Sequence, residues 1–202
     1  MYTILSIQLV TTALFVILGC YSRAYRKFIG RNRWLLVTSA VVSIIIFYTF
    51  IYVRVTSKKV PLNYIMLGIF TVCESYSVSA TTINYDNKTV FIAAVLTALM
   101  VVALTLYAFY TKKDFTMMGG LLFVCCAMII GASILGMFIQ NRFYHLIISA
   151  LTIVLFSVYI IFDTQLIIGN GGLALEVDEY IFAALNLYMD IIILFIEILK
   201  LL

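Results

Sequence analysis

Charged residues are scarce in this chain of 202 residues, where 13 lysines and arginines and 9 aspartates and glutamates make up 11% of the sequence. A soluble globular domain carries about 25% charged and about 45–50% apolar residues. Because 65% of this chain is hydrophobic, the composition excludes a soluble domain. The net charge of +4 comes from basic residues between the hydrophobic runs, so it indicates membrane topology and no nucleic-acid partner.

Proline, histidine and paired cysteines are also nearly absent. The single proline, Pro61, fits the first turn of a helix, where its missing N–H costs nothing. The single histidine, His145, stands at the edge of a hydrophobic run and supports no metal site. Without a C-x-x-C spacing, the four cysteines are interpreted as buried small hydrophobes, and no cofactor is predicted; they are Cys20, Cys73, Cys125 and Cys126.

The sequence instead contains seven hydrophobic runs of about 20 residues, each long enough to cross a hydrocarbon layer about 30 Å thick. We therefore predict an all-α membrane protein with one multi-pass domain over residues 1–202. The predicted spans are residues 3–20, 35–54, 62–82, 89–110, 117–139, 144–168 and 180–201. Four glycines of the fifth span are predicted to permit close helix packing, namely Gly119, Gly120, Gly131 and Gly136.

Basic residues gather after the first predicted span. The segment contains Arg23, Arg26, Lys27, Arg31 and Arg33. Trp34, which follows it, is predicted to anchor the second span at the membrane interface. The tendency of basic loops to stay in the cytosol, taken alone, places this segment on the cytosolic side.

Two carboxylates, Asp163 and Asp190, lie inside the last two hydrophobic runs. A charged side chain at membrane depth is costly, so it marks an ion path, a proton relay or a paired partner. Asn186, Asp190 and Glu197 are spaced at i, i+4 and i+11, close to one face of the last helix. Because this polar stripe needs shielding from lipid, we predict that the last helix is central and that the others pack around it.

A further carboxylate, Glu74, stands near the middle of the third run beside several serines and threonines. A helix this polar is expected to face other helices and not lipid all round, since its small residues suit close packing. With Asn186 and Glu197, it is a candidate for an ion path. The turn between the last two runs is acidic, with Glu176, Asp178 and Glu179.

The last two runs contain a long characteristic pattern, made of DTQLIIGN from residue 163, DEY from residue 178 and IFAALNLYMDII from residue 181. This pattern resembles the C-terminal signature of the Bax inhibitor family and, within it, the lifeguard branch. It extends upstream through FTVCES from residue 70, TKKDF from residue 111 and FIQNR from residue 138, and so covers nearly the whole chain. Glu74 matches a recurrent glutamate of the family. Glu197 stands where relatives tend to have an aromatic residue or histidine, so we regard it as a local addition.

The resemblance implies a calcium leak channel of internal membranes, in the endoplasmic reticulum or Golgi, that regulates calcium stores and cell death. It implies that Asp163 and Asp190 act as a pH-sensitive pair, with calcium as the permeant ion. It also implies a cytosolic N-terminus, opposite to the side that the basic residues favour. Since relatives carry a segment ahead of the first span, we expect either a short family member or part of a longer protein.

The physical chemistry of two nearby carboxylates fits this role. In a low dielectric both cannot ionise cheaply, so they share a proton and titrate as a unit. Losing the proton would push the helices apart and free oxygen ligands for a transient calcium ion at Asp163 and Asp190. At 1.5 Å per residue, Asp163 lies about 8 Å and Asp190 about 17 Å from the linker. The pair is therefore predicted to meet only if the sixth helix ends early or the linker dips inward.

Two other functions compete with the channel. An intramembrane aspartyl protease needs G-x-G-D and P-A-L motifs, but Met189 precedes Asp190, and no G-x-S-x-G serine motif is present. We therefore predict that the protein is not an enzyme. The alternative is an anti-apoptotic regulator without transport activity. It would act by binding other apoptosis-regulating membrane proteins in the bilayer, and its aspartates would only join helices.

Overall fold

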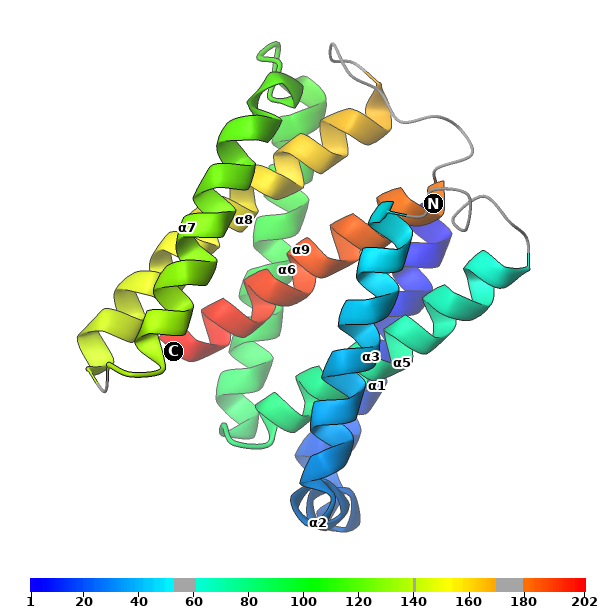
Figure 1. Ribbon diagram of the computed structural model, residues 1–202, viewed down its shortest axis with the longest axis vertical. Coiled ribbons are helices and arrows are strands. Elements are labelled where there is room, and N and C mark those ends of the chain that lie inside the picture. Colours follow the sequence, from blue (N-terminus) through cyan, green and yellow to red (C-terminus); the bar gives the residue numbers. More distant parts are fainter. Residues whose placement is uncertain (53–60, 140, 170–179) are drawn as a thin grey trace. The chain divides into compact units, whose positions relative to one another are not determined.

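The computed structural model describes residues 1–52, 61–139, 141–169 and 180–202. Within these ranges all regular structure is helical, which confirms the predicted all-α class. The α-helices, labelled in Figure 1, are α1 (Tyr2–Tyr21), α2 (Arg23–Arg31), α3 (Arg33–Tyr52), α5 (Leu62–Thr82), α6 (Asn87–Tyr110), α7 (Gly119–Gly136), α8 (Arg142–Ile168) and α9 (Tyr180–Leu201). A 3-10 turn, η1 (Thr116–Met118), precedes α7.

All seven hydrophobic runs form helices, so the chain is a multi-pass membrane protein. Six helical segments are long and apolar enough to cross a membrane: α1, α3, α6, η1 with α7, α8 and α9. Helix α5 is long enough, with 21 residues, but it is more polar than these six segments and is not among the candidate spans. The seventh crossing therefore stays a prediction.

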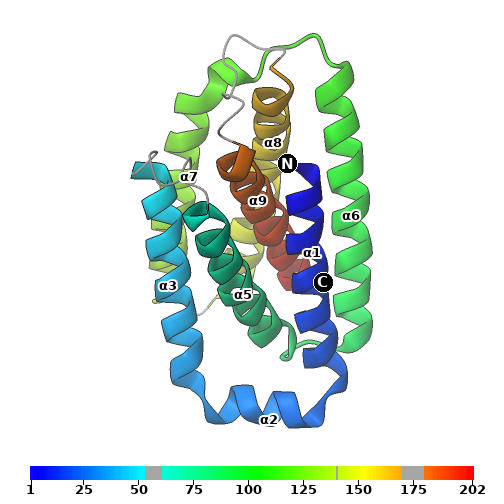
Figure 2. The ribbon, with the colours of Figure 1, turned by 90° about the vertical axis from the view of Figure 1, so that its right-hand side faces the viewer.

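The chain forms two compact units. The first contains Met1–Asn87 and Glu176–Tyr188, and the second contains Lys88–Leu175 and Met189–Leu202. In the first unit, α5 packs against both α1 and α3, and Figure 2 shows it between them. Gly19 allows α1 to approach α5 closely, because a Cβ atom at this position would lie only 2.7 Å from Ser79 Oγ.

The basic segment after α1 was predicted as a connection, but it is the nine-residue helix α2. Ser22 caps its start, because its hydroxyl oxygen accepts a hydrogen bond from the Tyr25 N–H at 3.3 Å. Arg26 caps the preceding helix by donating to the carbonyls of Gly19 at 2.7 Å and Cys20 at 2.8 Å. These contacts fold the basic segment back onto the end of α1.

In the second unit, α7 packs against α8. Two of the four glycines predicted to permit packing have a neighbour, since a Cβ atom at Gly119 would meet Phe162 and one at Gly136 would meet Tyr144. At Gly120 and Gly131 the prediction was wrong, because no described atom lies within 4 Å of an added Cβ. These two glycines lie on a face of α7 that no neighbouring described side chain approaches.

The first six residues of the DTQLIIGN string, 163–168, form the end of α8. Gln165 joins it to the turn before η1, accepting from the Phe115 N–H at 2.8 Å and donating to the Lys113 carbonyl at 2.9 Å. The helix then stops at Gly169, whose positive φ of 73° suits a residue without a side chain. The sequence predicted this break at Gly169. The remaining predicted breakers, at 170–172, lie outside the described residues.

Helix α9 is the most enclosed of the six candidate spans. Buried residues make up 67% of its apolar window, against 28% or less in the other five. Its fully buried side chains include Ile181, Leu185, Tyr188, Leu194 and Leu199. Of the predicted polar stripe, Asp190 is buried, whereas Asn186 and Glu197 are half-buried. The central place of α9 in a seven-helix bundle stays a prediction.

Candidate functional site

Asp163 of α8 and Asp190 of α9 meet within the second unit. Their side chains hydrogen-bond each other. Both are deeply buried, with exposed fractions of 8% for Asp163 and 6% for Asp190. The sequence singled out these two carboxylates as a pair, and the structure brings them together.

The surroundings of Asp190 restrict how this contact can form. Its Oδ2 atom is buried, and no N–H or hydroxyl group in the described part of the chain donates to it. A carboxylate has only acceptors, so a hydrogen bond between two carboxyl groups needs a proton on one of them. Two bare carboxylates at this place would repel each other in a medium of low dielectric. A hydrogen bond within the pair therefore requires one shared proton, and the presence of that proton stays a prediction.

Two residues that the sequence analysis missed lie beside the pair. Tyr159 is close to both carboxyls, and its hydroxyl hydrogen-bonds the thiol of Cys126 on α7. Tyr159 precedes Asp163 by four residues, so the helical period alone places the two on one face of α8. Cys126 gave no such signal, because only the packing of α7 against α8 brings it here.

Neither aspartate required the early helix end that the sequence analysis considered. Helix α8 continues to Ile168, five residues beyond Asp163, and α9 begins at Tyr180, as predicted within one residue. Of the two alternatives that the sequence left open, the shortened α8 is therefore not observed. The alternative, an inward linker, concerns residues 170–179, which lie outside the described residues together with Glu176, Asp178 and Glu179.

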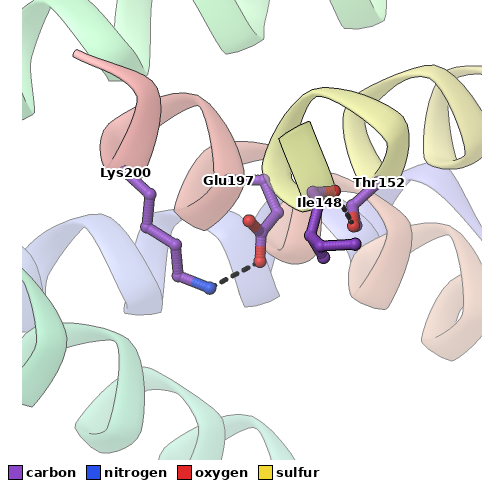
Figure 3. A network of polar contacts seen from close by, with 4 residues as sticks. All are labelled: Ile148, Thr152, Glu197 and Lys200. Atoms are coloured by element: carbon purple, nitrogen blue, oxygen red, sulfur yellow. Dashed lines mark hydrogen bonds and ion pairs between the residues drawn. The ribbon is translucent and has the colours of Figure 1, made fainter. Parts of the chain in front are cut away.

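Glu197 lies two turns beyond Asp190 and has a partner of its own. Lys200 donates to its Oε1 atom at 2.6 Å, and the exposed fraction is 13% for the Glu197 side chain and 45% for Lys200. Figure 3 shows this ion pair beside the α8 turn in which the Thr152 hydroxyl donates to the Ile148 carbonyl at 2.7 Å. Lys200 therefore compensates the negative charge of Glu197 near the end of α9. Its role in an ion path stays a prediction.

The other two candidates belong to the first unit. Glu74 of α5 is half-buried and hydrogen-bonds Ser43 of α3. Asn186 of α9 is half-buried, and no hydrogen bond within the described ranges joins it to Glu74. Glu74 is instead close to Tyr188, one of the fully buried residues of α9. These positions leave the ion-path role of both residues a prediction.

A hydrogen-bonded seam joins three helices of the first unit. The Thr12 hydroxyl of α1 contacts the Tyr188 hydroxyl of α9 at 2.8 Å and the Ser75 hydroxyl of α5 at 3.0 Å. One turn earlier, the Gln8 amide donates to the Thr71 hydroxyl at 3.1 Å. All five side chains are buried. The polar flank of α5 was evident from the sequence, but its partners on α1 and α9 were not.

The described side chains provide little for a permanent metal ion. They contain no group of three or more His, Cys, Asp or Glu residues that could hold one. Calcium takes about 6–8 oxygen ligands, and the Asp163–Asp190 pair supplies two carboxylates. The pair could therefore hold a calcium ion only with additional ligands, and the predicted transient contact is not tested by this geometry.

The whole chain, residues 1–202, matches the family profile described as "Inhibitor of apoptosis-promoting Bax1". It is 34% identical over 201 residues to the Golgi anti-apoptotic protein of Vaccinia virus (strain Lister), covering 100% of this chain and 82% of that protein. It is 34% identical over 199 residues to protein lifeguard 4 of Mus musculus, covering 98% and 81%. With protein lifeguard 3 of Mus musculus it shares 29% over 204 residues, covering 99% of this chain but only 66% of that protein.

Proposed function

The chain belongs to the Bax inhibitor family, with the lifeguard and Golgi anti-apoptotic proteins, and from this membership we propose a calcium leak channel of internal membranes. Members of the family are non-enzymatic membrane proteins. The proposed channel regulates calcium stores and, through them, cell death. The observation that carries the proposal is the buried hydrogen bond between Asp163 and Asp190.

The proposed closed state keeps one proton between the two carboxyls. The proton allows one carboxyl to donate to the other, and this hydrogen bond holds α8 to α9 at the level of the pair. No other N–H or hydroxyl of the described residues donates to Asp190 Oδ2. The closed contact therefore depends on the proton and not on a permanent donor.

The proposed open state follows loss of that proton. As pH rises, the pair carries two negative charges, and their repulsion favours separation of the two helices. The freed carboxylate oxygens then attract calcium, which prefers oxygen ligands. The leak should therefore be small at low pH and increase as pH rises through the titration of the pair.

Calcium flux from liposomes containing the purified full chain tests this sign. The unsubstituted protein should show flux that increases with pH. Asp163→Asn and Asp190→Asn keep the side-chain shape but remove the shared titration, so each should leave a flux with little pH dependence. Glu74→Gln is the control, because it also replaces one carboxyl by an amide, at a half-buried position of α5 outside the aspartate pair. It should alter the amount of flux without removing the pH midpoint. An aspartate variant that retains the original pH profile contradicts the proposal.

The second candidate function is an anti-apoptotic regulator that binds partner membrane proteins and transports nothing. The name of the Vaccinia virus relative, Golgi anti-apoptotic protein, favours it and also favours a location in endomembranes. Under this function the aspartates only join α8 to α9, and the purified protein alone should pass no calcium at any pH. The same liposome measurement therefore separates the two functions.

A further inference from the structure

Helix α2 is held at a membrane surface by its connections. It lies between α1 and α3, both long and apolar enough to cross a bilayer. Only Ser22 separates α2 from α1, and only Asn32 separates it from α3. Figure 2 shows α2 running between the ends of these two helices. Because a single residue gives no slack on either side, α2 must lie where the two spans leave the hydrocarbon layer.

Contacts of one face of α2 with the rest of the first unit fix its orientation about its own axis. Ile29, with an exposed fraction of 5%, packs against Tyr76 and Ala80 of α5. Arg26 is bound to the end of α1 and also donates to Asn87 Oδ1 at 3.1 Å. With this face occupied, the other face of α2 points away from the protein.

Three cations occupy that outward face. Arg23, Lys27 and Arg31 are spaced at i, i+4 and i+8, so they share one side of the helix, and all three are exposed. None of them hydrogen-bonds or ion-pairs with another side chain that the structure describes. No aspartate or glutamate precedes Glu74 in the sequence, and Asp86, which adjoins Asn87, forms no ion pair with these three cations among the described side chains.

Aromatic side chains flank these cations. Tyr21 precedes α2 with an exposed fraction of 78%, Phe28 lies on it, and Trp34 follows it with an exposed fraction of 63%. Exposed aromatic residues at the end of a membrane span suit the depth of the lipid headgroups. A short basic helix with aromatic neighbours is typical of a segment that lies in the membrane interface.

We propose that α2 binds anionic phospholipids in the leaflet against which it lies. Arg23, Lys27 and Arg31 pair with phosphate and other anionic headgroup oxygens, while Phe28 and Trp34 enter the interface beside them. Lipid fits this surface better than an acidic protein does, because the two flanking spans hold the cations at headgroup level in every copy of the chain.

The only tryptophan of the chain, Trp34, reports directly on the lipid composition around α2. The full chain is reconstituted in phosphatidylcholine vesicles that contain equal mole fractions of a brominated quencher lipid, either phosphatidylglycerol or phosphatidylcholine. Quenching by the anionic lipid should correspond to a preference of about five-fold or more, since one Lys or Arg near the surface contributes about that factor.

The variant Arg23→Gln/Lys27→Gln should lower this preference to near one. Its control, Lys112→Gln/Lys113→Gln, also removes two exposed positive charges, but from the turn between α6 and η1. The control should retain the preference. Equal quenching of the unsubstituted protein by both lipids means that the cations face water or another macromolecule, and it overturns the proposal, as does an unchanged preference in the α2 variant.

Salt provides a test without substitution. Raising the ionic strength from 0.15 M to 1 M shortens the Debye length from about 8 Å to about 3 Å. The preference of the unsubstituted protein for the anionic lipid should then decrease several-fold, while quenching by phosphatidylcholine stays constant. A preference that persists unchanged at 1 M salt does not come from charge and rules out the proposed pairing.

Discussion

Replacing Thr12 by valine should destabilise the first unit, because Thr12 is the point where three helices share one hydroxyl group. The hydroxyl contacts Tyr188 at 2.8 Å and Ser75 at 3.0 Å, and it also donates to the Gln8 carbonyl at 2.9 Å. Valine keeps nearly the same shape and removes only the polar atom. The loss is therefore that of hydrogen bonding within a buried seam.

The magnitude follows from the two contacts between helices. Such hydrogen bonds in membrane proteins average about 0.6 kcal/mol each, with a maximum near 1.7 kcal/mol. A buried hydroxyl left without a partner adds about 1–3 kcal/mol. Ser75 also hydrogen-bonds Tyr188, so the Tyr188 hydroxyl keeps one partner when Thr12 is replaced. We therefore expect Thr12→Val to lower the free energy of unfolding by about 1–2 kcal/mol, near the lower end of the summed contributions.

Thermal unfolding of the detergent-purified protein measures this loss, at about 2–4 °C for each kcal/mol in a chain of this size. The control is Thr11→Val, the same substitution at the next residue, where the hydroxyl only donates to the Ile7 carbonyl of its own helix. Combining Thr12→Val with Tyr188→Phe should give a coupling energy of about 0.6–1.7 kcal/mol. Equal effects of Thr12→Val and Thr11→Val, or a coupling of zero, would refute the role of the seam.

Two further predictions concern close packing; the first is tested by the same unfolding measurement and the second by folded yield. Gly19→Ala should lower the free energy of unfolding by about 1–3 kcal/mol, because the added methyl group overpacks against Ser79. Adding Ser79→Ala to this variant should partly restore stability. The control is Gly68→Ala, which should not destabilise by overpacking because no described atom lies within 4 Å of the added Cβ atom. Ala184→Leu should lower folded yield more than Ile192→Leu, because the fully buried Ala184 has no room for three added carbons; similar yields would contradict the tight enclosure of α9.

The helices were predictable because long apolar runs separated by charged residues have few other folds. Helix α2 was missed for the opposite reason. Its nine residues include four cations, a composition typical of a polar connection between spans. Only the packing of Ile29 against α5, which the sequence does not show, indicates a helix held against the protein. The packing glycines show the same limit. Gly19 is closely packed and Gly120 is not, although both stand in equally apolar runs.

The candidate site was predictable only in part. Asp163 and Asp190 stand out because charge inside an apolar run is rare. Thr12 does not stand out, because a single threonine is common in membrane helices and donates to its own helix whether or not it meets a partner. Tyr188 looks like any other aromatic residue of the last run. Their contact depends on how α1 and α9 approach each other, which local sequence does not encode.

The surroundings of Asp190 and Glu197 in α9 differ, and this difference explains why the proposed sensor is the aspartate pair and not Glu197. Glu197 already has a cation beside it, because Lys200 Nζ lies 2.6 Å from its Oε1 atom. No lysine or arginine stands between Arg142 and Lys200 in the sequence, so the cations of these two helices lie 21 residues before Asp163 and 10 residues after Asp190. Because neither helix places a cation next to the pair, we expect its charge to be balanced by a proton or by an ion that enters from outside. A fixed salt bridge at this place would hold the helices together at every pH. A pair without one changes its charge with the surroundings, as a pH-gated leak requires.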